Sequence, residues 1–370
     1  MLAALASGYH GPPELTFARA FSSWQLDPWS LAAIVALGVL YLAGVIRLRR
    51  RGEPWPVGRI VAFCGLGLGF GVIATMSSVG VYQPVLFYMR SVQTILLLLV
   101  VPLFLALGRP LSLIIDVAPR VGPWLASAIR SRTARVITFP VITTFVLVLT
   151  PFLIYFTPWY AAGFTSALVG QLTQVALMLP GFVFFWTLLR VDPVPKAYPY
   201  VVALWITAAE VIGDAVLGLA VVADTSLIAG PYYHALARPW GPSLATTQVL
   251  GGGVLWIVGD IVGLPFLAAQ LIQMMREDEV EAQLIDAELD AAEPALAVTG
   301  LAATTQTSIA QASSAQASSA QAVTGQPIVG RAPTGPGTTG SAGPGPGAMQ
   351  PWWETDRRFA DRFRAVDEQD

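Results

Sequence analysis

Long runs of apolar residues, separated by short polar loops, fill the first 275 positions of the chain. A helix needs about 20 consecutive apolar residues to cross the hydrocarbon core of a bilayer. Seven stretches approach or exceed this length: 30–46, 59–80, 86–108, 136–157, 165–189, 198–222 and 248–274. The pattern predicts an all-α integral membrane protein, with a bundle of seven transmembrane helices over residues 30–275.

Positive charge lies mainly in alternate loops. The second and fourth loops, SVGVYQP and TPWYAAGF, carry no Lys or Arg, and the sixth carries only Arg238. The basic residues of the first, third and fifth loops are Arg47, Arg49, Arg50, Arg51, Arg59, Arg109, Arg120, Arg130, Arg132, Arg135, Arg190 and Lys196. Since Lys and Arg favour cytoplasmic loops, this predicts the N-terminus outside and the C-terminus in the cytoplasm. Residues 1–29 then form an extracytoplasmic segment, and their composition predicts no cleaved signal peptide.

Beyond the last span the composition changes twice. Residues 276–297 place apolar side chains at helical spacing among dense acids, which predicts an acidic cytoplasmic helix. Residues 298–350 are low in complexity and include AQASSAQASSAQA, so we expect a disordered linker. Residues 351–370 form a short aromatic and charged element. Its large aromatic side chains are candidates for contact with a partner or the membrane surface, or belong to a frayed tail: Trp352, Trp353, Phe359 and Phe363.

Composition excludes several other classes of protein. The chain is 55% hydrophobic and 12% charged with a net charge of −2, so no basic surface for nucleic acid is expected. Cys64 is the single cysteine, and both histidines, His10 and His234, lie outside the predicted spans. The single lysine, Lys196, lies in a loop, which excludes a retinal Schiff base in the last span. No nucleophilic or metal-dependent catalytic set is visible, so we expect no enzyme.

Four ionisable residues fall inside the predicted spans: Arg90, Glu210, Asp214 and Asp260. Each costs roughly 2.5–3.5 kcal/mol on insertion scales, so such side chains usually face the bundle interior and find partners. Glu210 and Asp214, four residues apart, share one face of a helix. The sequence therefore predicts polar groups at the centre of the bundle.

Polar uncharged side chains accompany these ions. Gln93 and Thr94 follow Arg90 in the third span, and Gln171 and Gln174 lie three residues apart in the fifth. If the helices enclose one bundle, these residues form one intramembrane polar cluster. Two interpretations stay open. Either Arg90 snorkels or pairs with an acid while the glutamines bond between helices, or the cluster opens outward and handles a proton, an ion or a partner's metal.

Several ordered segments resemble a known family. The segments VLFYMRSVQTILLLLVVPLFLALGRPLSL, PGFVFFWTLLRVDPVP and GPYYHALARPWGPSLATTQVLGGGVLWIVGD are similar to the multi-spanning CtaG family of cytochrome c oxidase assembly factors in Gram-positive bacteria. The resemblance covers about residues 30–280. It implies a multi-pass protein of the bacterial plasma membrane that assembles a heme-copper oxidase, with the lipid bilayer and oxidase subunits as partners.

Copper handling by intramembrane histidines is a further implication of the resemblance. The family's histidine positions fall here on Arg90, Thr94, Gly170, Gln174 and Asp214. Every one is substituted, so the resemblance implies a divergent member without the copper-type histidine site, and no cofactor is expected. An Arg90–Asp214 ion pair would then fill the same space.

Two other functions remain as alternatives. The first is a proton- or ion-coupled transporter that uses the intramembrane acids Glu210, Asp214 and Asp260, although the sequence shows no internal repeat. The second is a membrane interaction scaffold that recruits a partner through the C-terminal element.

Overall fold

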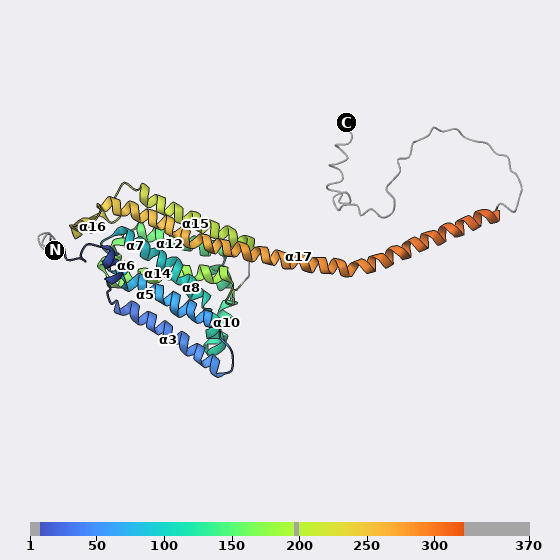
Figure 1. Cartoon of the computed structure of the whole chain (residues 1–370), viewed down its shortest axis with the longest axis horizontal. Helices are drawn as coiled ribbons and strands as arrows, with labels where there is room; N and C mark the ends of the chain where they lie inside the picture. The colour runs from blue at the N-terminus through green and yellow to red at the C-terminus, as the bar shows by residue number, and fades with distance from the viewer. Residues whose placement is uncertain (1–7, 196–199, 322–370) are drawn as a thin grey trace, which may run out of the picture. The chain divides into compact units, whose positions relative to one another are not determined.

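The computed structural model describes residues 8–195 and 200–321 and contains only helices and loops there. The chain divides into two compact units, Met1–Glu288 and Leu289–Asp370. In the first unit the long helices lie side by side (Figure 1). The prediction of an all-α fold is therefore confirmed.

The first span is a single long helix. A short helix, α2 (Phe17–Ser22), precedes α3 (Pro28–Arg50). Asp27 caps α3 because its carboxylate accepts hydrogen bonds from the backbone N–H groups of Trp29 and Ser30. Pro28 is the first residue of the helix, where a backbone N–H would have no partner within the helix. Arg47, Arg49 and Arg50 fill the last turn, where cations favour the negative end of the helix dipole.

The second and third spans are each built from several consecutive pieces. The second comprises α4 (Val57–Ile60), the π-helical η1 (Val61–Gly67), α5 (Leu68–Met76) and α6 (Ser78–Tyr82). The third comprises α7 (Phe87–Ile95), the π-helical η2 (Leu96–Val100) and α8 (Val101–Leu107). The sequence predicted each as one regular helix, and hydropathy carries no signal for such local changes in winding.

Pro102 accounts for the irregular winding of the third span. Proline has no N–H to donate to the carbonyl four residues earlier, so the carbonyl of Leu98 loses its regular partner. A π-helical turn at such a point is one way a helix absorbs the mismatch. Gly181 of α14 (Ala167–Leu189) packs directly on the Leu98 carbonyl, where any added Cβ would clash.

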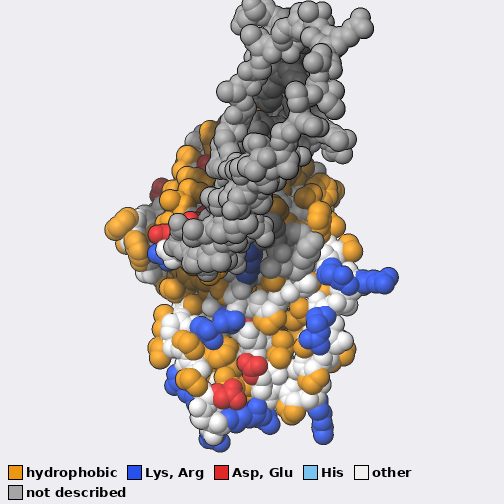
Figure 2. Space-filling view, turned by 90° about the vertical axis from the view of Figure 1, so that its right-hand side faces the viewer, with side chains coloured by type: hydrophobic (Ala, Val, Ile, Leu, Met, Phe, Trp, Pro, Cys, Tyr) orange, Lys and Arg blue, Asp and Glu red, His pale blue; other side chains and the backbone are white. Residues whose placement is uncertain are grey.

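Three short helices follow the third span: α9 (Pro110–Val117), α10 (Val121–Ile129) and α11 (Arg132–Ile137). They occupy the predicted third loop, and α9 packs against α3. Figure 2 faces the end of the bundle where α10 lies and shows Lys and Arg side chains spread around it.

The fourth span is bent. α12 (Pro140–Tyr155) and α13 (Trp159–Thr165) meet at 68° across a break of three residues that includes Pro158. The predicted span, 136–157, contained α12 and missed α13. The residues of α13 fell largely in the predicted fourth loop, TPWYAAGF, which gave no sign of a helix.

The remaining helices are α14, α15 (Tyr200–Ala223), α16 (Gly230–Leu236) and α17 (Leu244–Gln321). α14 packs against both α8 and α12, and α12 packs against α15. Among the described residues, six helices are long and apolar enough to cross a membrane, or seven if α12 and α13 form one span.

α17 runs further than the sequence predicted. The last span and the acidic helix form one continuous helix, which continues over residues 298–321, where we expected a disordered linker. Ala and Gln are strong helix formers, and Gly and Pro become frequent only after Gln321. The rest of the linker and the four aromatic residues Trp352, Trp353, Phe359 and Phe363 lie outside the described residues.

Large apolar side chains cover the outside of the bundle. Trp205 and Ile212 of α15 are 72% and 63% exposed, and Phe145 of α12 is 62% exposed. Soluble monomers rarely expose continuous apolar surface on this scale, whereas lipid covers it without cost. The exposed apolar faces and the long helices together indicate a multi-pass membrane protein.

Candidate functional site

Arg90 of α7 lies inside the bundle with only 3% of its surface exposed. Its Nη1 donates to Oε1 of Gln83 at 3.0 Å and to Oε1 of Gln93 at 2.7 Å. These two amides hold the guanidinium in the interior. The interpretation in which Arg90 snorkels to the surface is therefore wrong.

Aromatic rings of α13 also pack near this guanidinium. Its Cζ lies 5.2 Å from the ring centre of Phe164 and 6.0 Å from that of Tyr160. Gly163 lies beside the guanidinium, and an added Cβ there would make an ordinary contact of 3.7 Å with Nη2 of Arg90. Such cation–π contacts contribute roughly 0.5–2 kcal/mol. The bend before α13 thus supplies part of the arginine's surroundings.

No carboxylate in the part of the chain that the structure describes neutralises this charge. Among the described residues, Nε and Nη2 of Arg90 have no hydrogen-bond partner, and the guanidinium has no acid within ion-pair distance. Leaving a buried cation unpaired is costly, so packing alone gives no reason for an arginine at this position. The N–H bonds of these two nitrogens can serve a water or an oxygen acceptor that reaches the centre of the bundle.

Hydroxyl groups extend the polar centre toward α12. Thr94 Oγ1 donates to the carbonyl of Arg90 at 3.0 Å and lies 3.1 Å from the hydroxyl of Tyr155. The same tyrosine hydroxyl lies 3.5 Å from Oγ of Ser91. Gln93 uses its Nε2 to donate to the carbonyl of Ala74 at 2.9 Å, which ties α7 to α5. Arg90, Gln93 and Thr94 therefore belong to one network of hydrogen bonds.

A pair of tyrosines closes the same region from α13 and α16. The hydroxyls of Tyr160 and Tyr233 lie 2.8 Å apart, and Phe87 of α7 stacks on the Tyr160 ring with centres 5.5 Å apart. Sequence reasoning did not select these tyrosines. Both fall in predicted loops, Tyr160 in the fourth and Tyr233 in the sixth, so no pattern within the spans pointed to them.

Gln171 and Gln174 lie in a different place. Oε1 of Gln174 accepts from Ser30 at 2.9 Å, and Nε2 of Gln171 donates to the carboxylate of Asp27 at 2.8 Å. Burial alone would raise the pKa of Asp27, but hydrogen bonds from Ser30, Gln171 and the backbone together lower it. This group joins the N-terminal ends of α3 and α14.

The three intramembrane acids form a third group between α15 and α17. Glu210 and Asp214 are both buried, and they face two glycines of α17. An added Cβ at Gly259 would lie 2.6 Å from Oδ2 of Asp214, and one at Gly263 would lie 3.3 Å from Oε2 of Glu210. Asp260 has one carboxylate oxygen, Oδ1, without a partner among the described residues.

The single predicted cluster is therefore three separate groups, centred on Arg90, on Gln171 with Gln174, and on the acids. The predicted Arg90–Asp214 ion pair is wrong: within the part of the chain that the structure describes, the contact at ion-pair distance joins Arg109 to Asp192, at 3.9 Å. Helical spacing shows which residues share a face of one helix. It does not show which neighbour that face meets.

Asp192 is a structural residue that sequence reasoning missed. Besides meeting Arg109, its carboxylate accepts the backbone N–H groups of Leu111 and Ser112 and the Ser112 hydroxyl. These bonds cap the start of α9, so the fifth loop anchors the third. The sequence feature that could have pointed to Asp192 is that it is an acidic residue in a loop whose other charged residues are basic.

Comparison with known proteins identifies the family. Residues 39–277 match a family described as cytochrome c oxidase caa3 assembly factors, or CtaG. The chain belongs to this family. The match extends from α3 to α17 and contains Arg90, Gln174 and the three acids.

Curated relatives of this CtaG protein come from mycobacteria. It is 30% identical over 280 residues to an uncharacterized protein of Mycobacterium bovis and to one of Mycobacterium tuberculosis, and 28% identical over 279 residues to one of Mycobacterium leprae. Each alignment covers 73% of this chain and 42% of the relative, so the chain spans about two fifths of their length. No solved structure matches it.

The positions that carry histidines in the resemblance to CtaG lie in all three groups. Arg90 and Thr94 belong to the arginine network, Gln174 bonds to Ser30, and Asp214 lies among the acids. Gly170 contributes no side chain and packs on the carbonyl of Gly163. Within residues 8–195 and the described side chains beyond, no three His, Cys, Asp or Glu residues are arranged to hold a metal ion.

Proposed function

We propose that this protein is an integral membrane assembly factor, acting as a non-enzymatic chaperone for a bacterial heme-copper cytochrome c oxidase. The observation that carries the proposal is the family match over residues 39–277, which includes nearly the whole helical bundle. Its partners would be the lipid bilayer and subunits of the oxidase. Its place would be the plasma membrane, with the N-terminus outside.

The side chains at the family's histidine positions do not fit copper. Copper prefers imidazole, thiolate or thioether ligands, whereas this chain offers a guanidinium, a hydroxyl, an amide and a carboxylate in separate groups. A buried guanidinium would also repel a metal cation placed beside it. We therefore propose that this member supports assembly without binding copper in its bundle.

The role we infer for the arginine centre is to fix the helix ends on one side of the bundle. Thr94 joins α7 to α12 through Tyr155, and Tyr160 joins α13 to α16 through Tyr233. Arg90 connects these pairs by its contacts with the α13 aromatic rings.

A strain that lacks the gene tests the proposed function. We expect loss of oxidase activity while the oxidase subunits are still synthesised, as measured by respiration and immunoblot. Expression of the full chain should restore activity, and added copper should not. Normal oxidase activity in the deletion strain would overturn the proposal.

The group of acids favours a second candidate function. Glu210, Asp214 and Asp260 lie on facing surfaces of α15 and α17, and intramembrane acids commonly carry protons or cations. A proton- or ion-coupled transporter would leave respiration intact in the deletion strain and change its tolerance of ions or external pH. The same strain therefore separates the two candidates.

A further inference from the structure

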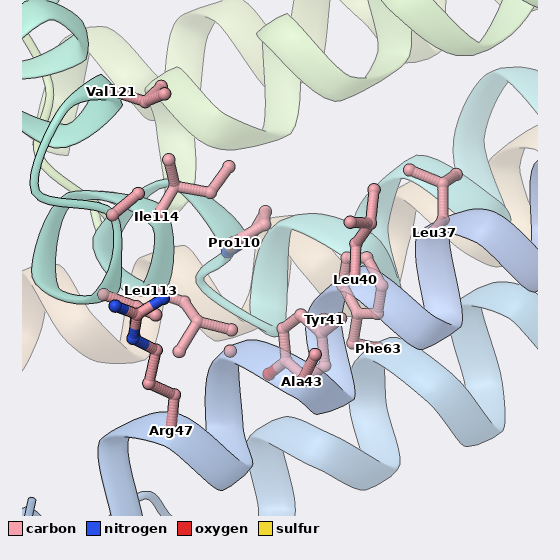
Figure 3. Close-up of a pocket in the computed structure, with 13 residues that line it drawn as sticks. Leu37, Leu40, Tyr41, Ala43, Arg47, Phe63, Pro110, Leu113, Ile114 and Val121 are labelled. Carbon is pink, nitrogen blue, oxygen red and sulfur yellow. The ribbon is translucent and has the colours of Figure 1, made fainter.

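An apolar groove of about 540 Å³ opens on the side of the bundle between α3, η1, α9 and α10 (Figure 3). Its volume lies within the range of roughly 300–1,000 Å³ that is typical of small-molecule sites. Leu37 and Leu40 of α3 line one side, and Leu113 and Ile114 of α9 line the other. The groove is separate from the three polar groups.

Ordered aromatic side chains keep the floor of this groove in place. The Tyr41 ring stacks on Phe63 with centres 4.0 Å apart, and its hydroxyl donates to the carbonyl of Gly108 at 2.7 Å. Trp55 Nε1 in turn donates to the Tyr41 hydroxyl at 3.1 Å. Because these polar atoms are satisfied by each other, the floor presents ring carbon to the groove.

One end of the groove carries a positive charge. Leu37, Leu40, Gly44 and Arg47 recur along one face of α3, so the apolar lining ends at an arginine in the last helical turn. Figure 3 shows Arg47 extending from α3 toward Leu113. Among the described residues, neighbouring Arg51 donates to the carbonyl of Asp116, whereas Arg47 makes no hydrogen bond or ion pair.

The position of the groove determines what can fill it. It lies on the outside of a membrane bundle, at the end that carries the basic loops, so lipid acyl chains have direct access. Arg120 directly precedes Val121, which lines the groove, and Trp124 follows one turn later in α10; both side chains are exposed. Aromatic and basic side chains of this kind mark the interface with lipid headgroups, and basic clusters there attract anionic lipids.

We propose that the groove is a binding site for an anionic phospholipid of the leaflet that faces the basic loops. One acyl chain lies along Leu37, Leu40, Leu113 and Ile114, and Arg47 binds the headgroup phosphate. A bound lipid would hold α9 and α10 against α3 and so fix the third loop.

Retention of defined lipids tests this site. The full-length protein is exchanged into micelles with equal amounts of palmitoyl-oleoyl phosphatidylglycerol and phosphatidylcholine, and native mass spectrometry counts the lipids it keeps. We expect phosphatidylglycerol to be retained preferentially. Arg47→Gln should weaken its retention roughly fivefold, the effect of one interfacial arginine on an anionic lipid.

Two further variants make the test specific. Arg50→Gln is the matched control, because Arg50 is an exposed arginine of the same turn that does not line the groove, and it should retain lipid like the wild type. Ala43→Phe fills the groove and should reduce retention of both lipids. Equal retention of both lipids by the wild type, an Arg47→Gln variant indistinguishable from Arg50→Gln, or a protein found in the groove instead of lipid would overturn the proposal.

Discussion

At the residue scale, Arg90 brings a full positive charge into the interior and bonds to two amides rather than to a carboxylate. The sequence predicted that Arg90, Gln93 and Thr94 act together, because they share a face of one helix. It did not predict Gln83, which approaches from the loop after α6, or the α13 rings, which depend on a bend that hydropathy does not show. Contacts within a helix were predictable, and contacts between helices were not.

A first prediction follows from the cost of this buried charge. Arg90→Met removes an unpaired cation and keeps a side chain of similar length, so the free energy of unfolding should be unchanged or rise by roughly 1–4 kcal/mol. Oxidase assembly should nevertheless be lost, because we propose that the assembly factor needs this arginine. Chemical unfolding in micelles gives the stability, and complementation of the deletion strain gives the function.

Gln93→Leu is the contrasting variant. It leaves the cation in place with one acceptor fewer and also removes the donor to the Ala74 carbonyl. The free energy of unfolding should fall by at least about 1.5–3 kcal/mol. If Arg90→Met were the more destabilised of the two variants, the buried cation would contribute net stability to the fold, which would contradict this prediction.

At the scale of the helices, close backbone approach decides the packing. Gly252 of α17 faces the carbonyl of Gly218 on α15, where an added Cβ would lie 2.7 Å away, while Gly253 has nothing within 4 Å. Gly251 also packs closely, since an added Cβ there would clash with the Phe87 ring. Which glycines are in contact depends on how α17 is rotated, and that is a property of the whole bundle.

Substitution of these two glycines tests the contact. Gly252→Ala should lower the free energy of unfolding by about 1–3 kcal/mol through overpacking. Gly253→Ala, the matched control on the same helix, should be neutral or stabilise by up to about 1 kcal/mol because alanine favours the helix. Thermal unfolding in the same micelles measures both, and equal effects would show that α15 and α17 do not meet in this way.

The cap of α3 gives a prediction in pH. The pKa of Asp27 is lowered in the folded protein from an ordinary value of 3.8. When folding lowers a carboxyl pKa, the ionised group stabilises the folded state. This stabilisation is complete at a pH above the pKa of the unfolded chain and is lost as the pH falls through the pKa of the folded protein. The difference in melting temperature between the wild type and Asp27→Asn should therefore be constant above about pH 5 and shrink below pH 4.

This pH dependence has a clear negative outcome. If the difference in melting temperature instead grew as the pH fell, the bonds from Ser30 and Gln171 would favour the protonated carboxyl of Asp27 and not the carboxylate.

At the scale of the whole molecule, hydropathy and composition predicted most of the architecture. They predicted an all-helical membrane bundle because each span must satisfy its own backbone. They could not predict that α17 continues to Gln321, since a tract rich in Ala, Gln and Ser is compatible with either a helix or a disordered linker.

The orientation of the bundle remains a prediction with a direct test. In a Cys64→Ser background, Thr225→Cys lies between α15 and α16, and Thr133→Cys lies in α11; both positions are exposed. A membrane-impermeant maleimide added to intact cells should label Thr225→Cys, and should label Thr133→Cys only after permeabilisation. The reverse result would place the N-terminus in the cytoplasm.

The central claim is that this CtaG protein holds an arginine-centred polar network where a copper site is implied for its family. The most direct measurement is the copper content of the full-length protein purified from cells grown with added copper. The account predicts no stoichiometric copper, and no change in Arg90→Ala, Gln174→Ala or Asp214→Ala. Stoichiometric copper in the wild type that is lost in any of these three variants would contradict it.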